Sequence, residues 1–251
     1  MDDPILAPPR AGPVFGGIAM SGPELHRFTD AATLLASLCA RVSDTLRTAI
    51  TARGRASLLV SGGRTPAALF DQLSREALDW SKVDLGLVDE RCVAPDSADS
   101  NENLVRSRLL QHRAAAANFM PMMNDEPGGA RAVRAWRNLA PLSRPLDLVL
   151  LGMGDDGHTA SWFPGSAALA TALDPAQPAG CLLVTPLDAP HERLTVNYSA
   201  LLQSRRLVVL INGESKWRVY ERAGGAGDTA AMPVRAILRQ QQVPVDVYWS
   251  P

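Results

Sequence analysis

Cysteine is scarce in this sequence. Cys39, Cys92 and Cys181 are widely spaced, and no CxxC pair occurs among the 251 residues. This pattern indicates neither a disulfide framework nor a thiolate metal site. Unpaired cysteines fit a reducing compartment, so we expect a cytoplasmic protein.

An excess of charge is also lacking, because 25 basic and 26 acidic side chains leave a formal net charge of -1. Such a balance argues against a nucleic-acid partner that binds a broad basic face. Any anionic ligand should therefore be small and held by a few placed residues. No run of about 18 apolar residues occurs, so we expect no membrane span.

Metal-binding motifs are missing as well. The sequence has no HExxH, and His26, His112 and His191 are isolated along the chain. We interpret these histidines as surface or packing residues and expect no metal and no cofactor.

The length and a hydrophobic content of 46% allow one large α/β domain or two small ones. Residues 1–22 contain scattered prolines and glycines and lack the basic start and apolar stretch of a secretory signal. We expect a poorly ordered leader over residues 1–22 and a single α/β domain over residues 23–251.

Strand and helix patterns alternate along this domain. Strands are predicted over residues 57–60, 83–88, 146–151, 182–184, 194–196, 207–211 and 243–249. Helices are predicted from Thr29 or Asp30 to Gly54, over 67–73, 132–139, 167–173 and 234–238, after Asn101, and around Lys216. Residues 114–129 look irregular and residues 223–229 form a flexible Gly-rich link. The alternation predicts a doubly wound, mainly parallel sheet flanked by helices, a Rossmann-like arrangement.

The stretch most suggestive of chemistry follows the apolar strand at 146–151. Gly152, Gly154 and Gly157 allow a tight turn that presents Asp156 and His158 beyond the carboxyl end of the strand. In open α/β sheets this end is the usual ligand side. Ordinary turn residues are the plain alternative.

The same three glycines also spell GxGxxG, which is a dinucleotide-binding fingerprint. Asp155 and Asp156 would place two negative charges where a pyrophosphate approaches, and no acidic residue closes a second strand about 20 residues later. We therefore do not expect a nicotinamide cofactor.

A second candidate site lies in the SGGRTP segment after the strand at 57–60. Thr65 suits a helix cap and Pro66 the first helical position, so free backbone N–H groups should point above the strand. Glycines, hydroxyls and a helix dipole together favour a phosphate, although a plain strand-to-helix turn is the alternative. The predicted phosphate-binding residues are Ser61, Gly62, Gly63, Arg64 and Thr65. A Walker lysine is missing, which argues against nucleotide triphosphates.

Further charged residues follow other strands. The strand at 83–88 delivers Asp89, Glu90 and Arg91; such a triplet is usually a solvated loop, but Arg91 could clamp an anion or developing negative charge. Lys216 lies in the first turn of a helix, where the dipole disfavours a cation unless a ligand offsets the cost. Arg193 directly precedes a predicted strand.

Three segments together resemble a known family. SGGRTP from Ser61, DER from Asp89 with the Asn101 region downstream, and LLGMGDDGHTASWFPGS from Leu150 are similar to the 6-phosphogluconolactonases of the glucosamine-6-phosphate isomerase/deaminase-like superfamily. HERLT from His191 and INGESK from Ile211 look like two further family segments. The resemblance spans about residues 27–249; only the abrupt C-terminal tail departs from it.

The resemblance implies hydrolysis of 6-phospho-D-glucono-1,5-lactone to 6-phospho-D-gluconate in the oxidative pentose phosphate pathway. An imidazole, with an ordinary pKa of about 6.5, can take a proton from water near neutral pH. We assign this role to His158, with Asp156 orienting the imidazole. Arg91 or turn N–H groups would meet the oxyanion, and Lys216 and Arg193 would add charge for the phosphate. Asp89 and Gly154 complete the predicted binding residues.

Two alternative functions are compatible with the same fold. Superfamily deaminases and isomerases carry a Glu five residues after the His, where this chain has Phe163. A sugar-phosphate-sensing regulator would need a DNA-binding segment, for which the leader is too short. We expect a small phosphosugar lactone as ligand, neither nucleic acid nor membrane as partner, and a monomer or weak homo-oligomer.

Overall fold

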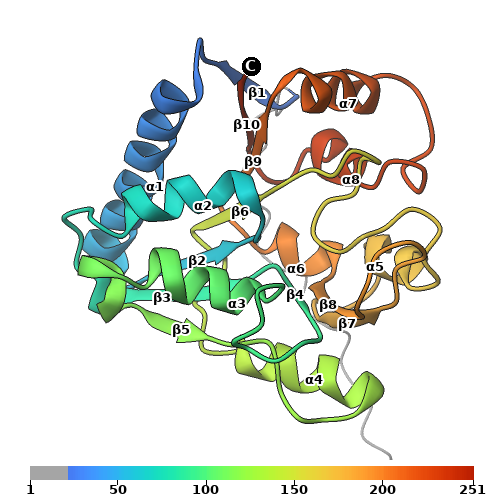
Figure 1. Ribbon diagram of the computed structural model, residues 1–251, viewed down its shortest axis with the longest axis horizontal. Coiled ribbons are helices and arrows are strands. Elements are labelled where there is room, and N and C mark those ends of the chain that lie inside the picture. Colours follow the sequence, from blue (N-terminus) through green and yellow to red (C-terminus); the bar gives the residue numbers. More distant parts are fainter. Residues whose placement is uncertain (1–21) are drawn as a thin grey trace, which may run out of the picture.

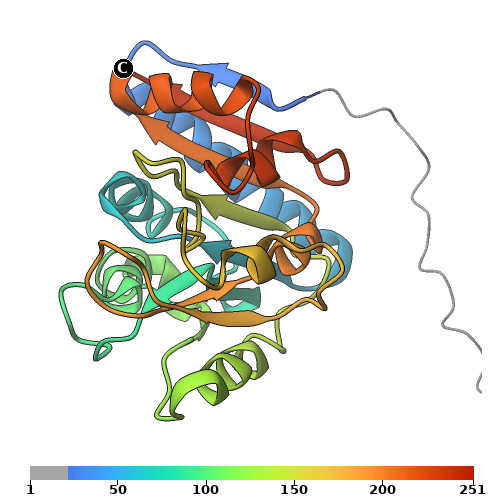
Figure 2. The same cartoon turned by 90° about the vertical axis from the view of Figure 1, so that its right-hand side faces the viewer.

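The computed structural model describes residues 22–251, so the leader expected over residues 1–22 lies outside the described residues except for Gly22. The described chain forms a seven-stranded sheet in the order β1-β10-β9-β6-β2-β3-β5 and a three-stranded sheet in the order β4-β8-β7. All neighbouring strands of the large sheet are parallel, and those of the small sheet are antiparallel. Figures 1 and 2 both place β1 and α7 at one end of the molecule and α4 at the other.

The strands are β1 (Glu24–Arg27), β2 (Ala56–Val60), β3 (Val83–Leu87), β4 (Asp89–Arg91), β5 (Asn118–Met120), β6 (Leu148–Leu151), β7 (Cys181–Val184), β8 (Arg193–Val196), β9 (Leu207–Asn212) and β10 (Val245–Ser250). The α-helices are α1 (Ala31–Arg53), α2 (Arg64–Leu73), α3 (Asn101–Leu104), α4 (Gly128–Asn138), α5 (Leu169–Leu173), α6 (Tyr198–Leu202), α7 (Glu214–Gly224) and α8 (Val234–Arg239). A π-helical turn over Val105–Leu109 continues α3, and 3-10 turns cover Trp80–Lys82 and His112–Ala116.

The first helix follows its sequence signals closely. The Asp30 side chain accepts a hydrogen bond from the Thr33 N–H at 2.8 Å, and Gly54 ends the helix in the left-handed region with φ 80°. Leu34, Leu38 and Leu46, which lie on one face of this helix, are buried in the core. The predicted α/β class with a mainly parallel sheet is confirmed.

Strand β6 occupies the middle of the large sheet, between β2 and β9. All four of its residues are buried, as expected for a strand covered on both faces. Its carboxyl end lies beside those of β2 and β9, because all three run in parallel. The loops that follow these strands are therefore brought together.

The small antiparallel sheet differs from the sequence prediction. The charged triplet at 89–91 is not a solvated loop: it forms β4, which pairs with β8, and Asp89 and Glu90 are buried. Burial is possible because both carboxylates accept hydrogen bonds within the fold. This long-range pairing leaves no trace in the local sequence.

Two connections are also more ordered than predicted. The irregular stretch at 114–129 contains β5, which adds an edge strand to β3. The link at 223–229 is held by guanidinium groups: Arg235 donates to the carbonyls of Arg222, Ala226 and Asp228, and Arg239 to two glycine carbonyls. These hydrogen bonds could not be predicted from the composition of the link, because the donors Arg235 and Arg239 belong to α8.

The start of α2 was predicted too late. The helix begins at Arg64 rather than at residue 67, and Gly63 is its N-cap with φ 115° and no side-chain cap hydrogen bond. Thr65 and Pro66 therefore lie inside the first turn. Within residues 22–251, no helix has both the length and the apolar character needed to cross a membrane.

Gly86 tests the packing of the large sheet. A Cβ at this position in β3 would lie 2.8 Å from side-chain carbons of both Leu139 and Leu59. We expect Gly86→Ala to lower the free energy of unfolding by about 1–3 kcal/mol through overpacking. Gly129→Ala is the matched control, since nothing lies within 4 Å of its added Cβ. Denaturant unfolding measures both, and equal stability of the two variants would contradict the packing described.

Candidate active site

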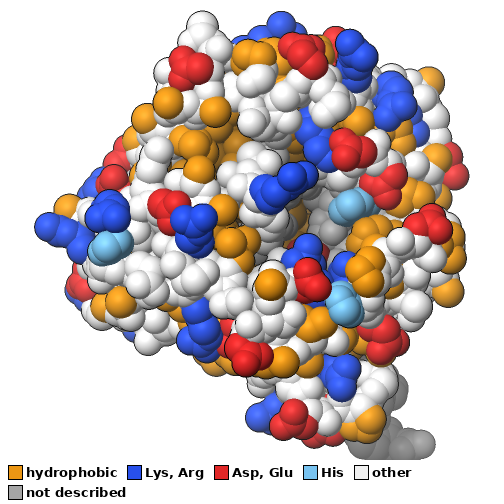
Figure 3. All heavy atoms as spheres, in the orientation of Figure 1, with side chains coloured by type: hydrophobic (Ala, Val, Ile, Leu, Met, Phe, Trp, Pro, Cys, Tyr) orange, Lys and Arg blue, Asp and Glu red, His pale blue; other side chains and the backbone are white. Residues whose placement is uncertain are grey.

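A cavity of about 260 Å³ opens at the carboxyl ends of the central strands. It is lined by the segments that follow β2, β6 and β9 and by residues of β4 and α3. Figure 3 shows a hollow on this face with basic side chains and histidine around it. Ten of the twelve predicted site residues line it: Ser61, Gly62, Gly63, Arg64, Thr65, Asp89, Arg91, Gly154, His158 and Lys216.

The turn after β6 is folded back on itself. The Gly154 N–H donates to the His158 carbonyl at 2.8 Å, and the Gly157 N–H donates to the Gly154 carbonyl at 3.1 Å. The Thr159 hydroxyl donates to the Gly152 carbonyl at 2.8 Å. Gly157 has φ 83°, a conformation that a residue with a side chain rarely adopts. These hydrogen bonds fix the backbone conformation from which the His158 side chain projects.

His158 and Asp156 are in direct contact. Nδ1 of His158 lies 2.7 Å from Oδ1 of Asp156, and the same oxygen accepts the His158 backbone N–H at 3.0 Å. A carboxylate beside Nδ1 favours the tautomer that carries its proton there, which leaves the lone pair of Nε2 free to accept a proton. The centroid of the Phe163 ring lies 4.7 Å from that of the imidazole, so the phenyl ring packs against the His158 side chain. Asp156 itself does not line the cavity.

Gly154 is required for this contact. A Cβ at this position would lie 2.1 Å from Nδ1 of His158 and 2.6 Å from Oδ1 of Asp156. Both distances are far below van der Waals contact, so any side chain at 154 would force the two groups apart. The absence of a side chain at Gly154 therefore makes room for the imidazole–carboxylate pair, and the residue also lines the cavity.

The Asp156 carboxyl is strongly acidic. Burial acts to raise its pKa, but hydrogen bonds from the His158 ring and backbone N–H lower the pKa from 3.8 to about 2. The group therefore carries a full negative charge at neutral pH. A permanent carboxylate next to Nδ1 can orient the imidazole.

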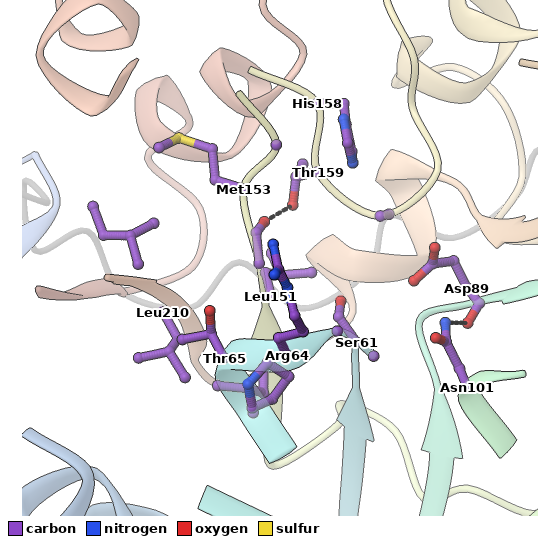
Figure 4. A pocket seen from close by; sticks show the side chains of 18 of the residues that line it. Ser61, Arg64, Thr65, Asp89, Asn101, Leu151, Met153, His158, Thr159 and Leu210 are labelled. Atoms are coloured by element: carbon purple, nitrogen blue, oxygen red, sulfur yellow. Dashed lines mark hydrogen bonds between the residues drawn. The ribbon is translucent and has the colours of Figure 1, made fainter. Parts of the chain in front are cut away.

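The opposite side of the cavity carries the loop after β2. Figure 4 shows His158 at the top of the cavity and Ser61, Arg64 and Thr65 toward the bottom. The first turn of α2 leaves its N–H groups without intrahelical partners, and the hydroxyl oxygen of Ser61 is buried with no hydrogen-bond partner among the described residues. Donors without partners next to a cavity are well suited to an anion.

Lys216 brings a cation to the same cavity from α7. Its Nζ lies 2.9 Å from Oδ1 of Asp155. The Lys216 side chain is 24% exposed and that of Asp155 78%, so the carboxylate can move away into solvent while the ammonium group stays at the cavity. The ion pair is therefore weak, and the Lys216 ammonium group stays available to a ligand.

The wall formed by β4 carries Asp89 and Arg91. Asp89 is buried and accepts a hydrogen bond from the Ser161 hydroxyl at 2.6 Å, while Nη1 of Arg91 donates to the Asp99 carbonyl at 2.7 Å. Both side chains line the cavity, as predicted. This wall therefore presents both a carboxylate and a guanidinium to the cavity.

Arg193 does not line the cavity. It lies opposite Arg91 in the β4–β8 pair, but its Nη1 donates to the carbonyls of Pro190 and His191 at 2.7 and 2.9 Å. One nitrogen of its guanidinium is thus bound to the loop that precedes β8. A role of Arg193 in phosphate binding stays a prediction.

Sequence reasoning missed some of the lining. Asn101 was used only to mark the start of a helix and a family segment, and Thr159 was not singled out, yet both line the cavity. Thr159 directly follows His158 and could have been found from that position. Asn101 could not, because its contact with the loop after β2 depends on the tertiary fold.

Potential metal ligands lie elsewhere. The described residues contain one group of three, Glu24, His26 and Asp246, and none of these residues lines the cavity. Asp246 is already paired with Nη1 of Arg206 at 2.6 Å, and the His26 ring stacks on Tyr248. This agrees with the interpretation of His26 as a packing residue.

Comparison with known proteins gives a consistent picture. A family model described as glucosamine-6-phosphate isomerases/6-phosphogluconolactonase matches residues 29–249. A 6-phosphogluconolactonase of Rhizobium meliloti (strain 1021) is 46% identical over 229 residues, which cover 91% of this chain and 99% of the relative. One of Pseudomonas putida is 40% identical, with 91% and 93% covered.

Solved structures agree. The crystal structure of a 6-phosphogluconolactonase from Shewanella baltica OS155 has 44% sequence identity and a TM-score of 0.89, covering 93% of this chain and 100% of that one. A monomeric glucosamine-6-phosphate deaminase has a TM-score of 0.72 at 19% identity, covering 90% and 97% of the two chains. At that identity the likeness concerns the fold alone.

The low pKa of Asp156 predicts how stability depends on pH. The folded state keeps this carboxyl ionised down to about pH 2, whereas the unfolded chain protonates it near 3.8. Stability from this group is thus present above pH 4 and declines below it. Because the side chain is 49% exposed, the effect should be only roughly 1 kcal/mol.

Asp156→Asn provides the measurement. The difference in unfolding free energy between the parent and this variant should be largest near pH 5 and shrink as the pH falls from about 4 toward 3. Urea unfolding at a series of pH values measures it. A difference that grows as the pH falls over this range would contradict the assigned hydrogen bond.

Proposed function

Because the chain belongs to the glucosamine-6-phosphate isomerase/6-phosphogluconolactonase family, we propose that it hydrolyses 6-phospho-D-glucono-1,5-lactone to 6-phospho-D-gluconate. Relatives named 6-phosphogluconolactonase support this activity at identities up to 46% over nine tenths of the chain. This reaction is a step of the pentose phosphate pathway.

One observation carries the proposed mechanism: an imidazole whose Nδ1 is held by a carboxylate lies across a small cavity from a loop of free N–H donors. A substrate with a phosphate at one end and a carbonyl at the other fits this polarity. The phosphate would bind at Ser61–Thr65, and the lactone carbonyl would lie beside His158.

In the proposed reaction, Nε2 of His158 takes a proton from water as the oxygen attacks the lactone carbonyl carbon. The anionic tetrahedral intermediate is stabilised by Arg91 or by backbone N–H groups of the turn. The bond from this carbon to the ring oxygen then breaks, and the imidazolium returns its proton to that oxygen. The product acid ionises in solution. Asp156 stays anionic throughout and stabilises the imidazolium.

The phosphate end would be held by a combination of charge and backbone donors. The N–H groups at the start of α2 and the Ser61 hydroxyl supply hydrogen bonds, and Lys216 and Arg64 supply positive charge. This binding energy orients the lactone before water attacks.

Phe163 favours a lactonase over a deaminase or isomerase. The residue five positions after His158 is a phenylalanine whose ring packs 4.7 Å from the imidazole. No carboxylate is available there to relay a proton between carbon atoms. Water attack on an ester carbonyl needs no such relay.

His158→Asn tests the proposed base. The variant keeps a polar side chain of similar shape but cannot accept a proton near neutral pH, so kcat should fall by about 10²–10⁴-fold. A pH-stat assay with freshly generated lactone measures the rate in excess of spontaneous hydrolysis. His112→Asn is the control, because His112 is exposed, lies outside the cavity and has φ 48°, which asparagine tolerates. Parental activity in His158→Asn would exclude the proposed role.

Lys216→Ala tests the phosphate end. Loss of one charge-assisted contact should raise KM for the lactone about 10–100-fold and leave kcat within a few fold. Lys82→Ala is the matched control, since Lys82 forms a comparable ion pair with Asp79 outside the cavity. Steady-state kinetics decides the point: a large fall in kcat with unchanged KM would move Lys216 from binding to chemistry.

A further inference from the structure

Glu90 is the one member of the charged triplet that does not line the cavity. Its neighbours Asp89 and Arg91 line the cavity, and because successive side chains of a strand alternate, Glu90 points to the other side of β4. Its side chain is fully buried, and no Lys, Arg or His among the described residues pairs with it. A buried carboxylate without a cation needs other partners.

Those partners are four hydrogen-bond donors. Oε1 accepts the backbone N–H groups of Arg91 at 2.6 Å and Asn101 at 2.7 Å. Oε2 accepts the backbone N–H of Glu102 at 2.7 Å and the Ser100 hydroxyl at 3.1 Å. Burial raises the pKa of Glu90, and these bonds act against that rise. Three of the four donors belong to the start of α3, so the carboxylate ties α3 to β4.

Asn101, the first residue of α3, extends this connection to the cavity. Its Nδ2 donates to the Asp89 carbonyl at 2.8 Å, and the residue is buried. Its Oδ1 lies against the loop after β2: a Cβ on Gly62 would come within 1.9 Å of it. Figure 4 shows Asn101 beside Asp89 at the edge of the cavity. The amide thus fills the space between β4 and the proposed phosphate loop.

We propose that Glu90 is a positioning residue that holds the proposed phosphate loop in its binding conformation through Asn101. This inference rests on the proposed function of residues 61–65. Without the carboxylate, the N–H groups of Asn101 and Glu102 lose their acceptor, and the Asn101 side chain loses its fixed place against Gly62. His158 and Asp156 lie on a separate turn after β6, so proton transfer should be largely unaffected.

Glu90→Gln separates these effects. The glutamine has nearly the same shape, but its NH₂ group cannot accept from the donors that now face a carboxylate oxygen. We expect the dissociation constant of inorganic phosphate and KM for the lactone to rise about tenfold each, with kcat within about threefold of the parent. Calorimetric titration with inorganic phosphate and steady-state kinetics provide these values.

Glu102→Gln is the matched control, because Glu102 is the neighbouring acid of α3 and its carboxylate pairs with Arg106 instead. Its phosphate affinity and KM should equal those of the parent. The inference is overturned if Glu90→Gln binds phosphate as tightly as the parent, or if its kcat falls while KM is unchanged.

Should circular dichroism show that Glu90→Gln does not fold, Asn101→Ala tests the same link while leaving the Glu90 carboxylate in place. It should weaken phosphate binding to a similar extent, and unchanged binding would overturn the inference. Phosphate titration needs no turnover. A parent chain that binds phosphate but does not hydrolyse the lactone would therefore refute the proposed reaction alone.

Discussion

The hydrogen bond between Asp156 and His158 constrains the conformation of the turn that follows β6 and the residue type at position 154. The two groups meet only because residue 154 has no side chain, and because the turn closes through the Gly154 N–H and the His158 carbonyl. The Val234 N–H at the start of α8 donates to the Gly157 carbonyl at 2.9 Å, so α8 also supports the turn. A tight, glycine-dependent turn fixed from both sides gives an imidazole a defined direction.

The parallel sheet brings this turn together with the loops that follow the neighbouring strands. The strands β2, β6 and β9 end side by side. The proposed phosphate loop at residues 61–65, the turn that carries His158 and the start of α7 with Lys216 therefore line one cavity. The antiparallel sheet adds the Asp89 wall. The cavity therefore presents Arg64, Lys216 and free N–H groups as well as the Asp89 carboxylate, and this uneven distribution of charge suits a ligand that is itself asymmetric.

Much of this could be predicted because the signals are local. Apolar runs marked β6 and β9, periodicity and caps marked α1, and the glycines around His158 marked the turn. Partner choice between distant segments was not visible. Strand β4 depends on its pairing with β8, and the Asn101 side chain donates to the Asp89 carbonyl of β4. Both contacts are set by the tertiary fold rather than by local composition.

We propose that one phosphosugar spans the cavity, with its phosphate at residues 61–65 and its carbonyl carbon at His158. A crystal structure with 6-phosphogluconate bound tests this proposal most directly. We expect phosphate oxygens within hydrogen-bond distance of the α2 N–H groups and Lys216, and the C1 carboxylate beside Nε2 of His158. The opposite orientation, or binding outside this cavity, would contradict it.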